Sequence, residues 1–187
     1  MNILIDELPK TLTIDGEECP IRYDFKTWIK FTQICSKEVN AKEVAEIFAL
    51  IFFKLPRRFD EAVRAIMEFY VPKKLVSSKQ GEQKSKRVYD FDFDSDSIYS
   101  AFLQQYKIDL CTAELHWCQF KALLDNLSEE TQFVKILQYR SVDLSQIKDK
   151  EQKKFYTKMK KLHALPDNRT EKQKEDDFNS TIAGLFS

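Results

Sequence analysis

The sequence predicts a mainly α protein, a multi-helix domain preceded by a short N-terminal β-hairpin. Up to about residue 23, apolar and polar residues alternate as they do in strands, around the turn-forming pair Asp15-Gly16. From Asp24 onward, apolar residues recur every three or four positions, which is the spacing of a helix. Apolar residues make up 43% of the 187-residue chain, so the chain can bury a core of its own.

The predicted hairpin pairs the strand of Leu12 and Ile14 with a second strand that follows Gly16. An Asp-Gly pair suits a type I′ turn because both residues tolerate a positive φ angle. We expect three parts in the chain, namely an N-terminal hairpin packed on the core, a helical domain and a flexible C-terminal tail, at residues 1–23, 24–166 and 167–187.

Helix starts are marked by residues whose side chains accept hydrogen bonds from free backbone N–H groups. Asp24 is the expected N-cap of a first helix, and Asn40 with Glu43 forms an approximate capping box for a second, which Pro56 should end. A third helix is expected from Phe59 up to Pro72. Four more are predicted to begin near Ser95 or Asp96, after Thr112, at Ser128 and after Asp149.

The composition changes between the third and fourth predicted helices. Lysines, serines and a glycine replace apolar residues there, which predicts a mobile basic loop at about residues 73–88. Immediately after it, Tyr89, Phe91 and Phe93 alternate with aspartates. This alternation predicts a short extended segment that returns the chain to the core.

Several classes of protein do not fit the composition. The 30 basic residues balance the 30 acidic ones, whereas a nucleic-acid-binding protein usually has a basic excess. The apolar run Ile47 to Phe53 is far shorter than the roughly 18 residues that a membrane span needs. Only three glycines occur, too few for a phosphate-binding loop. The cysteines lack CxxC spacing, so free and mostly buried thiols in a reducing cytoplasm are expected at Cys19, Cys35, Cys111 and Cys118.

The motif Asp90-x-Asp92-x-Asp94 resembles the first three ligands of a calcium loop. Such a loop also needs glycine at its sixth position and glutamate at its twelfth, where this chain has Ser95 and Ala101. A solvated acidic segment leading into a helix cap is the preferred interpretation.

Cys111, His116 and Cys118 form the other candidate cluster. On one helix His116 would point away from Cys118, and His163 is the only other histidine that could complete a zinc site or serve as a base. We therefore predict no catalytic residue, no metal site and no cofactor, and we expect the protein not to be an enzyme.

Apolar helix faces are the better candidates for function. The second predicted helix is apolar nearly all round, so it either lies centrally in the core or presents surplus apolar surface to another chain. The tail has helical apolar spacing and could dock in a groove. The partner-binding residues predicted from these two segments are Leu50, Phe52, Phe53, Phe178, Ile182 and Leu185.

Lysines surround the amphipathic helix predicted after Asp149. One interpretation is a contact with nucleic acid or with an acidic partner helix. The preferred one is a solvated face whose lysines extend over apolar neighbours.

Short sequence segments distributed along most of the chain resemble those of a family of tail-region proteins of long-tailed bacteriophages, named for the fifteenth gene product. The resemblance extends to about Pro166 and is weakest in the lysine-rich loop. A second tryptophan that is frequent in the family is replaced here by Cys118. The similar strings are Asn2 to Pro9, Ile14-Asp15-Gly16, Asp24-Phe25 with Trp28, Tyr89 to Asp92 through Asp96, Ile98 to Phe102, Leu115-His116-Trp117, Phe120 to Leu123, Tyr139-Arg140, Ile147-Lys148 and Leu165-Pro166.

The resemblance implies a phage or prophage protein encoded between the major tail protein and the tape measure. Proteins at that position are commonly tail assembly chaperones, which would bind the tape-measure protein and tail tube components in the host bacterial cytoplasm and could also self-associate. The alternative is a structural head–tail connector or tail completion protein that stays in the virion. Neither a membrane nor nucleic acid is an expected partner.

Overall fold

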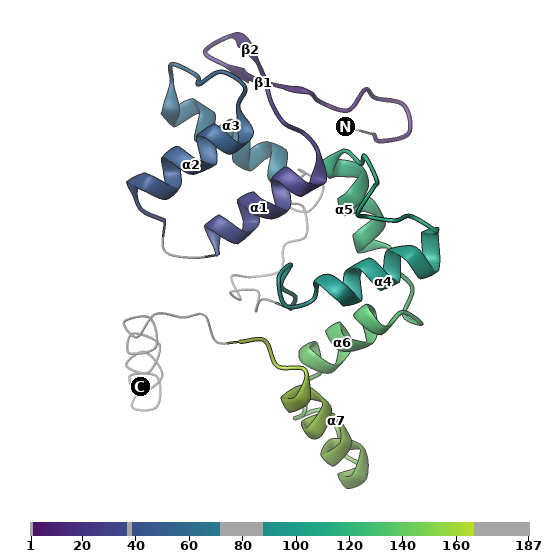
Figure 1. Ribbon diagram of the computed structural model, residues 1–187. Coiled ribbons are helices and arrows are strands. Elements are labelled where there is room, and N and C mark those ends of the chain that lie inside the picture. The colour runs from purple at the N-terminus through teal and green to yellow at the C-terminus, as the bar shows by residue number, and fades with distance from the viewer. Residues whose placement is uncertain (1, 37–38, 72–87, 167–187) are drawn as a thin grey trace, which may run out of the picture.

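The computed structural model describes residues 2–36, 39–71 and 88–166, and within them it is mainly helical, as predicted (Figure 1). The predicted basic loop, except for Val88, and the predicted tail lie outside the described residues. The elements are β1 (Thr11–Ile14), β2 (Glu17–Pro20), α1 (Phe25–Cys35), α2 (Ala41–Ile51), α3 (Phe59–Tyr70), α4 (Ser95–Tyr106), α5 (Trp117–Asp125), α6 (Gln132–Ser141) and α7 (Lys150–Leu162).

The predicted hairpin is confirmed. Strands β1 and β2 pair antiparallel, with Ile14 opposite Glu17, and the two residues between them, Asp15 and Gly16, have φ angles of 53° and 74°. A type I′ turn requires a positive φ at both central positions. The inward side chains of β1 pack against α3, and the Asp15 N–H donates to a carboxylate oxygen of Glu61 over 2.8 Å.

Three of the predicted helix starts are confirmed in detail. Asp24 caps α1 by accepting the N–H of Thr27, and Asp149 caps α7 in the same way. Asn40 and Glu43 form the capping box of α2. Each start depends only on residues within one turn of the cap, which explains why the sequence was sufficient.

The end of α2 differs from the prediction, because the helix stops at Ile51, before Pro56. Arg22 provides the reason. Its backbone N–H donates to the Ile51 carbonyl over 2.8 Å, and its guanidinium lies 3.1–3.2 Å from three carbonyl oxygens at the end of the helix. A positive group at a helix C-terminus also complements the helix dipole. Leu55, which the predicted end at Pro56 would place inside the helix, is consequently outside it and exposed.

Two helices in the second half begin later than predicted. The helix expected after Thr112 starts at Trp117, with His116 as its N-cap. The helix expected at Ser128 starts at Gln132, because Thr131 is the N-cap and residues from Ser128 form a preceding turn closed by the Thr131 N–H. Histidine is not among the preferred capping residues, so its role at α5 had no sequence signal.

The extended segment predicted at Tyr89 to Phe93 is wrong, because the chain forms a turn there. A side-chain oxygen of Asp90 accepts the N–H groups of Asp92 and Phe93, each over 2.7 Å, and the Asp94 N–H donates to the Asp90 carbonyl. Aspartate side chains commonly compete for backbone in this way. Phe91 is therefore buried while Phe93 is 53% exposed.

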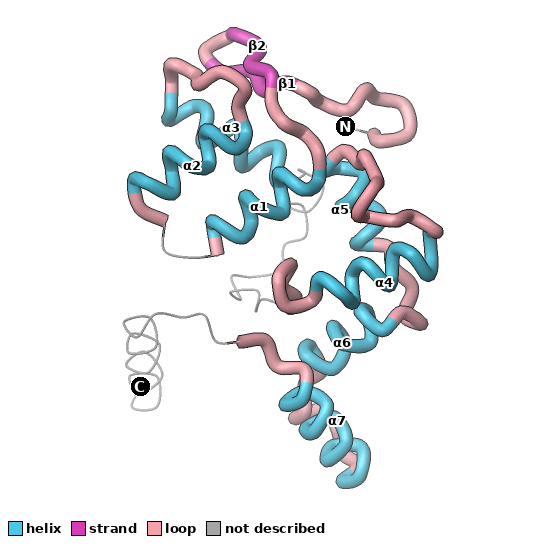
Figure 2. The backbone as a smooth tube through the Cα atoms, viewed as in Figure 1, coloured by secondary structure: helices cyan, strands magenta, loops and turns pink. Residues whose placement is uncertain are grey.

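The first and second halves of the chain meet between α1 and α5 (Figures 1 and 2). The Phe25 N–H donates to the Leu115 carbonyl over 3.0 Å, and the Trp117 N–H donates to the Tyr23 carbonyl over 2.8 Å. The core at this joint is aromatic, since large rings bury much apolar area. Its fully buried rings are Trp28, Phe102, Trp117 and Phe120.

Candidate docking surface

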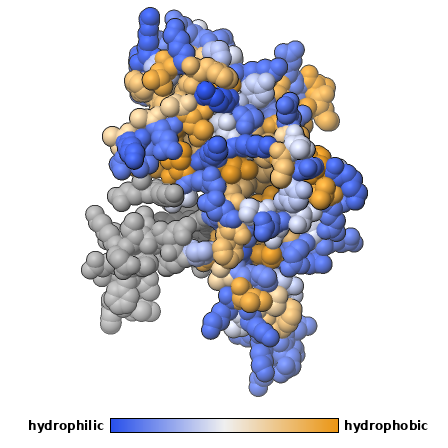
Figure 3. Space-filling view, viewed as in Figure 1, coloured by the Kyte–Doolittle hydropathy of each residue, from blue (hydrophilic) through white to orange (hydrophobic). Residues whose placement is uncertain are grey.

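Helix α3 presents an exposed apolar stripe next to its buried side. Its inner side, with Ala62, Ile66 and Phe69, belongs to the core. The exposed residues follow one another at intervals of four, which keeps them on one side of the helix. We call them the α3 stripe: Phe59, Val63 and Met67 on the helix and Val71 at its C-cap, which are 54%, 48%, 48% and 37% exposed. Figure 3 shows apolar side chains lying among charged ones over the half that contains the hairpin and α1 to α3.

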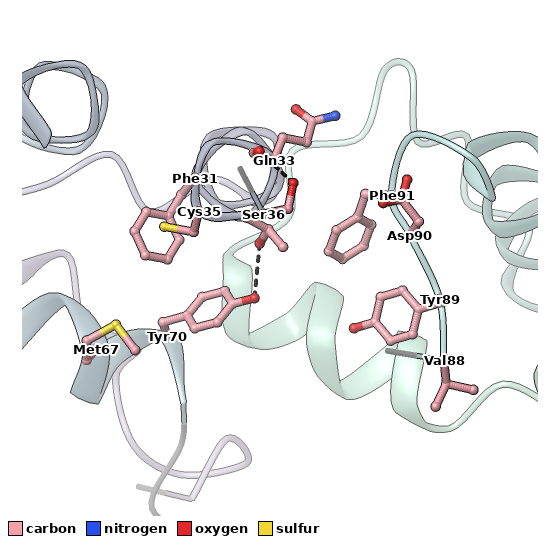
Figure 4. A pocket seen from close by; sticks show the side chains of 11 residues that line it. Phe31, Gln33, Cys35, Ser36, Met67, Tyr70, Val88, Tyr89, Asp90 and Phe91 are labelled. Carbon is pink, nitrogen blue, oxygen red and sulfur yellow. Dashed lines mark hydrogen bonds between the residues drawn. The ribbon is translucent and has the colours of Figure 1, made fainter. Parts of the chain in front are cut away.

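A cavity of about 430 Å³ adjoins the α3 stripe, and Met67 belongs to both. Its walls come from the end of α1, the end of α3 and the segment that leads into α4. Figure 4 shows Phe31, Tyr70 and Phe91 facing this space from those three places. A cavity of this volume lies in the size range of ligand-binding pockets and can hold a large side chain of a partner.

The cavity walls are mainly apolar, although their residues include the ionisable Cys35, Tyr70, Tyr89 and Asp90. The hydroxyls of Thr32 and Tyr70 lie 3.0 Å apart and hydrogen-bond to each other. Partial burial of the thiol raises the pKa of Cys35, although the residue as a whole is exposed, and burial likewise raises the pKa of Tyr70 against the lowering effect of Thr32. Both groups therefore stay protonated at neutral pH, which suits an uncharged apolar occupant.

The residues predicted on α2 are only partly available at the surface. Phe52 is 3% exposed and lies in the core, and Leu50 packs against the core, which supports the central-core interpretation of α2. Phe53 is 65% exposed, with the Arg22 guanidinium 4.6 Å from its ring centroid. The predicted tail residues Phe178, Ile182 and Leu185 lie outside the described residues.

The surface that sequence reasoning missed is the α3 stripe. The sequence predicts a third helix from Phe59 up to Pro72 but does not distinguish its exposed side from its buried side. The available signal was the large number of apolar residues in that helix, more than one face can hold. Which side would be covered depended on where β1 and α2 pack.

His116 has a structural role. No cysteine lies beside it in a metal-binding arrangement. Its Nδ1 accepts the Cys118 N–H over 3.0 Å, and its Nε2 donates to the Pro9 carbonyl over 2.9 Å. A carbonyl oxygen only accepts, so the proton resides on Nε2 and the ring is neutral. The side chain is 6% exposed and stacks on Tyr23.

The other members of the two candidate metal clusters are also placed apart or occupied. Cys111 precedes α5 and is exposed, as is Cys35. The expectation of mostly buried thiols is therefore wrong, because Cys19 is half-buried and only Cys118 of the four is buried. Asp94 holds Arg140 with both carboxylate oxygens. Within residues 2–36, 39–71 and 88–166, no three histidine, cysteine or acidic side chains are grouped so that they could hold a metal.

A buried ion pair organises the second half of the chain. The Arg140 guanidinium donates to the two carboxylate oxygens of Asp94 over 2.6 and 2.8 Å, and both side chains are less than a tenth exposed. Arg140 also donates to the carbonyls of Val88 and His163. One side chain of α6 thus holds the segment before α4, the N-cap of α4 and the C-cap of α7.

Comparison with known protein families then identifies the chain. The model of the Bacteriophage Gp15 protein family matches residues 4–165, which is most of the sequence. The chain belongs to this Gp15 family. The match includes the α3 stripe, His116 and Arg140, and it ends before the predicted docking residues of the tail.

No curated protein and no solved structure matches this Gp15 family member. Among the described residues, no helix is long and apolar enough to cross a membrane.

Proposed function

We propose that this protein is a tail assembly chaperone that binds the tape-measure protein during phage tail assembly. Membership of the Gp15 family supports a role in a phage. The single observation that supports binding is the α3 stripe with its adjoining cavity. Three of the four stripe residues are about half exposed, although soluble monomers seldom leave such a run uncovered.

The physical basis of the proposal is recognition of a helix by a groove. A tape-measure protein is expected to be long and helical, with apolar faces that need cover until tube subunits surround it. A partner helix would align its apolar residues with Phe59, Val63 and Met67, and one larger side chain would enter the cavity beside Met67. Binding in this mode requires no catalytic residue.

Co-expression with the tape-measure protein of the same genome tests the proposal. We expect the wild-type chain to raise the yield of soluble tape-measure protein and to co-purify with it. Val63→Asp places a charge in the middle of the α3 stripe and should lower the co-purified amount about tenfold or more, as at a central interface residue. The measurement is the stoichiometry of the purified complex.

The matched control is Leu103→Asp on α4. Leu103 is 42% exposed, close to the 48% of Val63, but it lies away from the α3 stripe. The Leu103→Asp variant should leave the amount of co-purified tape-measure protein unchanged. Unchanged solubility of the tape-measure protein with wild-type chain, or equal effects of the two variants, would contradict the proposal. Stoichiometric presence in purified virions would favour the structural connector instead.

A further inference from the structure

The segment before β1 displays two aliphatic side chains on an ordered turn. The N–H groups of Ile5 and Asp6 both donate to the Asn2 carbonyl, and the Asn2 side chain accepts the Leu4 N–H. These bonds fix the turn with Leu4 and Ile5 pointing outward, 87% and 80% exposed. The segment is fastened to the body where Pro9 meets His116.

The N-terminal segment and the hairpin that follows it are together acidic. Residues 2–20 contain five acidic residues and one lysine, for a net charge of −4. The acidic side chains flank the exposed turn and continue into the hairpin, at Asp6, Glu7, Asp15, Glu17 and Glu18. This end of the molecule therefore combines the apolar Leu4–Ile5 turn with negatively charged side chains around it.

Helix α7 has the complementary character. Its thirteen residues contain six lysines and one glutamate, for a net charge of +5. Phe155 and Leu162, seven residues apart and so on one side, are 50% and 67% exposed. The α7 helix is held on α6 by the ring of Tyr139, which contacts Tyr156 and the edge of Phe155, and by Lys160, which donates to the Val142 carbonyl. The outer parts of Phe155 and Leu162 remain exposed and form an apolar edge bordered by lysines.

The two regions lie at opposite ends of the molecule, the N-terminal segment and hairpin at one end and α7 at the other (Figures 1 and 2). They cannot meet within one copy. We propose that copies of this chain associate head to tail, the Leu4–Ile5 turn of one copy docking on the Phe155–Leu162 edge of α7 of the next.

A second copy fits α7 better than a nucleic acid does. Phosphates would engage the lysines but would leave Phe155 and Leu162 exposed to water, whereas the N-terminal segment offers both negative charge and aliphatic side chains. Such a contact joins two different surfaces, so it builds a ring or an open chain and does not stop at a symmetric dimer. It does not use the α3 stripe, so it is independent of the proposed client binding.

Two variants, each altered at one end, test the arrangement. Leu4→Lys with Ile5→Lys removes the apolar tip, and Lys153→Glu with Lys154→Glu reverses charge at exposed positions of α7. In sedimentation velocity, the wild-type chain should form species larger than a dimer, with association about tenfold weaker at high salt. Each variant alone should be monomeric. Mixed in equal amounts, the variants should form a dimer, because one intact surface of each kind remains.

Lys30→Glu with Lys42→Glu makes the same charge change at exposed positions of α1 and α2 and should associate like the wild type. Circular dichroism of every variant verifies that the helices are intact. A monomeric wild-type chain would overturn the proposal. So would association that persists in either variant alone, a mixture that stays monomeric, or association that nuclease treatment abolishes. Client co-purification by these variants reports separately on the proposed function.

Discussion

At the scale of single residues, His116 illustrates how a chemically reactive side chain becomes structural. Burial lowers the pKa of His116 below its ordinary 6.5, and the nearby charge of Lys10 lowers it further, against the raising effect of the Pro9 carbonyl. The folded state therefore favours the neutral ring, which accepts from Cys118 and donates to Pro9. Protonation would place a proton on Nδ1 and break the helix cap.

This predicts a pH dependence of stability. A histidine with a lowered folded-state pKa binds fewer protons in the folded than in the unfolded chain, so its stabilisation is complete above the unfolded pKa and is lost as pH falls below about 6.5. His116→Asn keeps a capping acceptor but cannot titrate. It should cost about 1 kcal/mol near neutral pH, and its deficit relative to wild type should shrink as the medium becomes acidic.

Urea unfolding of both proteins at about pH 7.5 and about pH 5.5 measures this difference. Nuclear magnetic resonance titration of the His116 ring gives the pKa directly. A folded-state pKa at or above 6.5, or a deficit that does not change with pH, would contradict the assignment.

At the scale of elements, Arg140 connects segments that have few other contacts with one another. Helix α7 contains no buried residue, so the bond from Arg140 to the His163 carbonyl and the contacts of Tyr139 with α7 are important for holding it on α6. The Asp94 carboxylate, 3% exposed, depends on Arg140 for charge compensation. Removing one partner of a buried pair leaves the other charge uncompensated.

We therefore expect Arg140→Met to destabilise the fold by about 3–5 kcal/mol, measured by urea unfolding. The matched control is Arg58→Met, which breaks another arginine–aspartate pair. Arg58 and Asp60 are 49% and 59% exposed, so water compensates the remaining charge and the midpoint should move much less. Equal midpoint shifts in the two variants would show that the buried pair stabilises the fold no more than the exposed pair does.

At the scale of the whole molecule, the two halves share one aromatic core at the joint of α1 and α5. The rings of Phe25 and Phe120 stack 4.8 Å apart, and those of Trp28 and Trp117 lie 6.3 Å apart. Both tryptophans are essentially unexposed and report on this joint. A shared core favours unfolding of the halves as one cooperative unit.

The expected result is that tryptophan fluorescence and far-ultraviolet circular dichroism give the same urea midpoint. Phe120→Ala should lower both midpoints together, at a cost of about 3–5 kcal/mol from the cavity it creates. A circular dichroism transition that precedes the fluorescence transition would show that α6 and α7 melt separately from the joint.

The sequence by itself determined the features that depend on neighbouring residues. The type I′ turn at Asp15-Gly16 and the caps Asp24, Asn40 and Asp149 were all predictable, because each needs only a residue's own backbone preference and partners within one turn. The mainly helical class followed from apolar periodicity for the same reason.

Only the tertiary structure decided which apolar faces are covered. Val63 and Phe52 are both apolar residues in or beside helices, yet Phe52 is buried where Ile21 pairs with it and Val63 is left half exposed. His116 is held in its capping position by Pro9, which is distant in the sequence. Arg140 likewise links Asp94 and His163, which come from distant parts of the chain. Local periodicity shows that a face is apolar, but burial depends on what packs against that face, and the packing of the described residues leaves the candidate docking surface about half exposed.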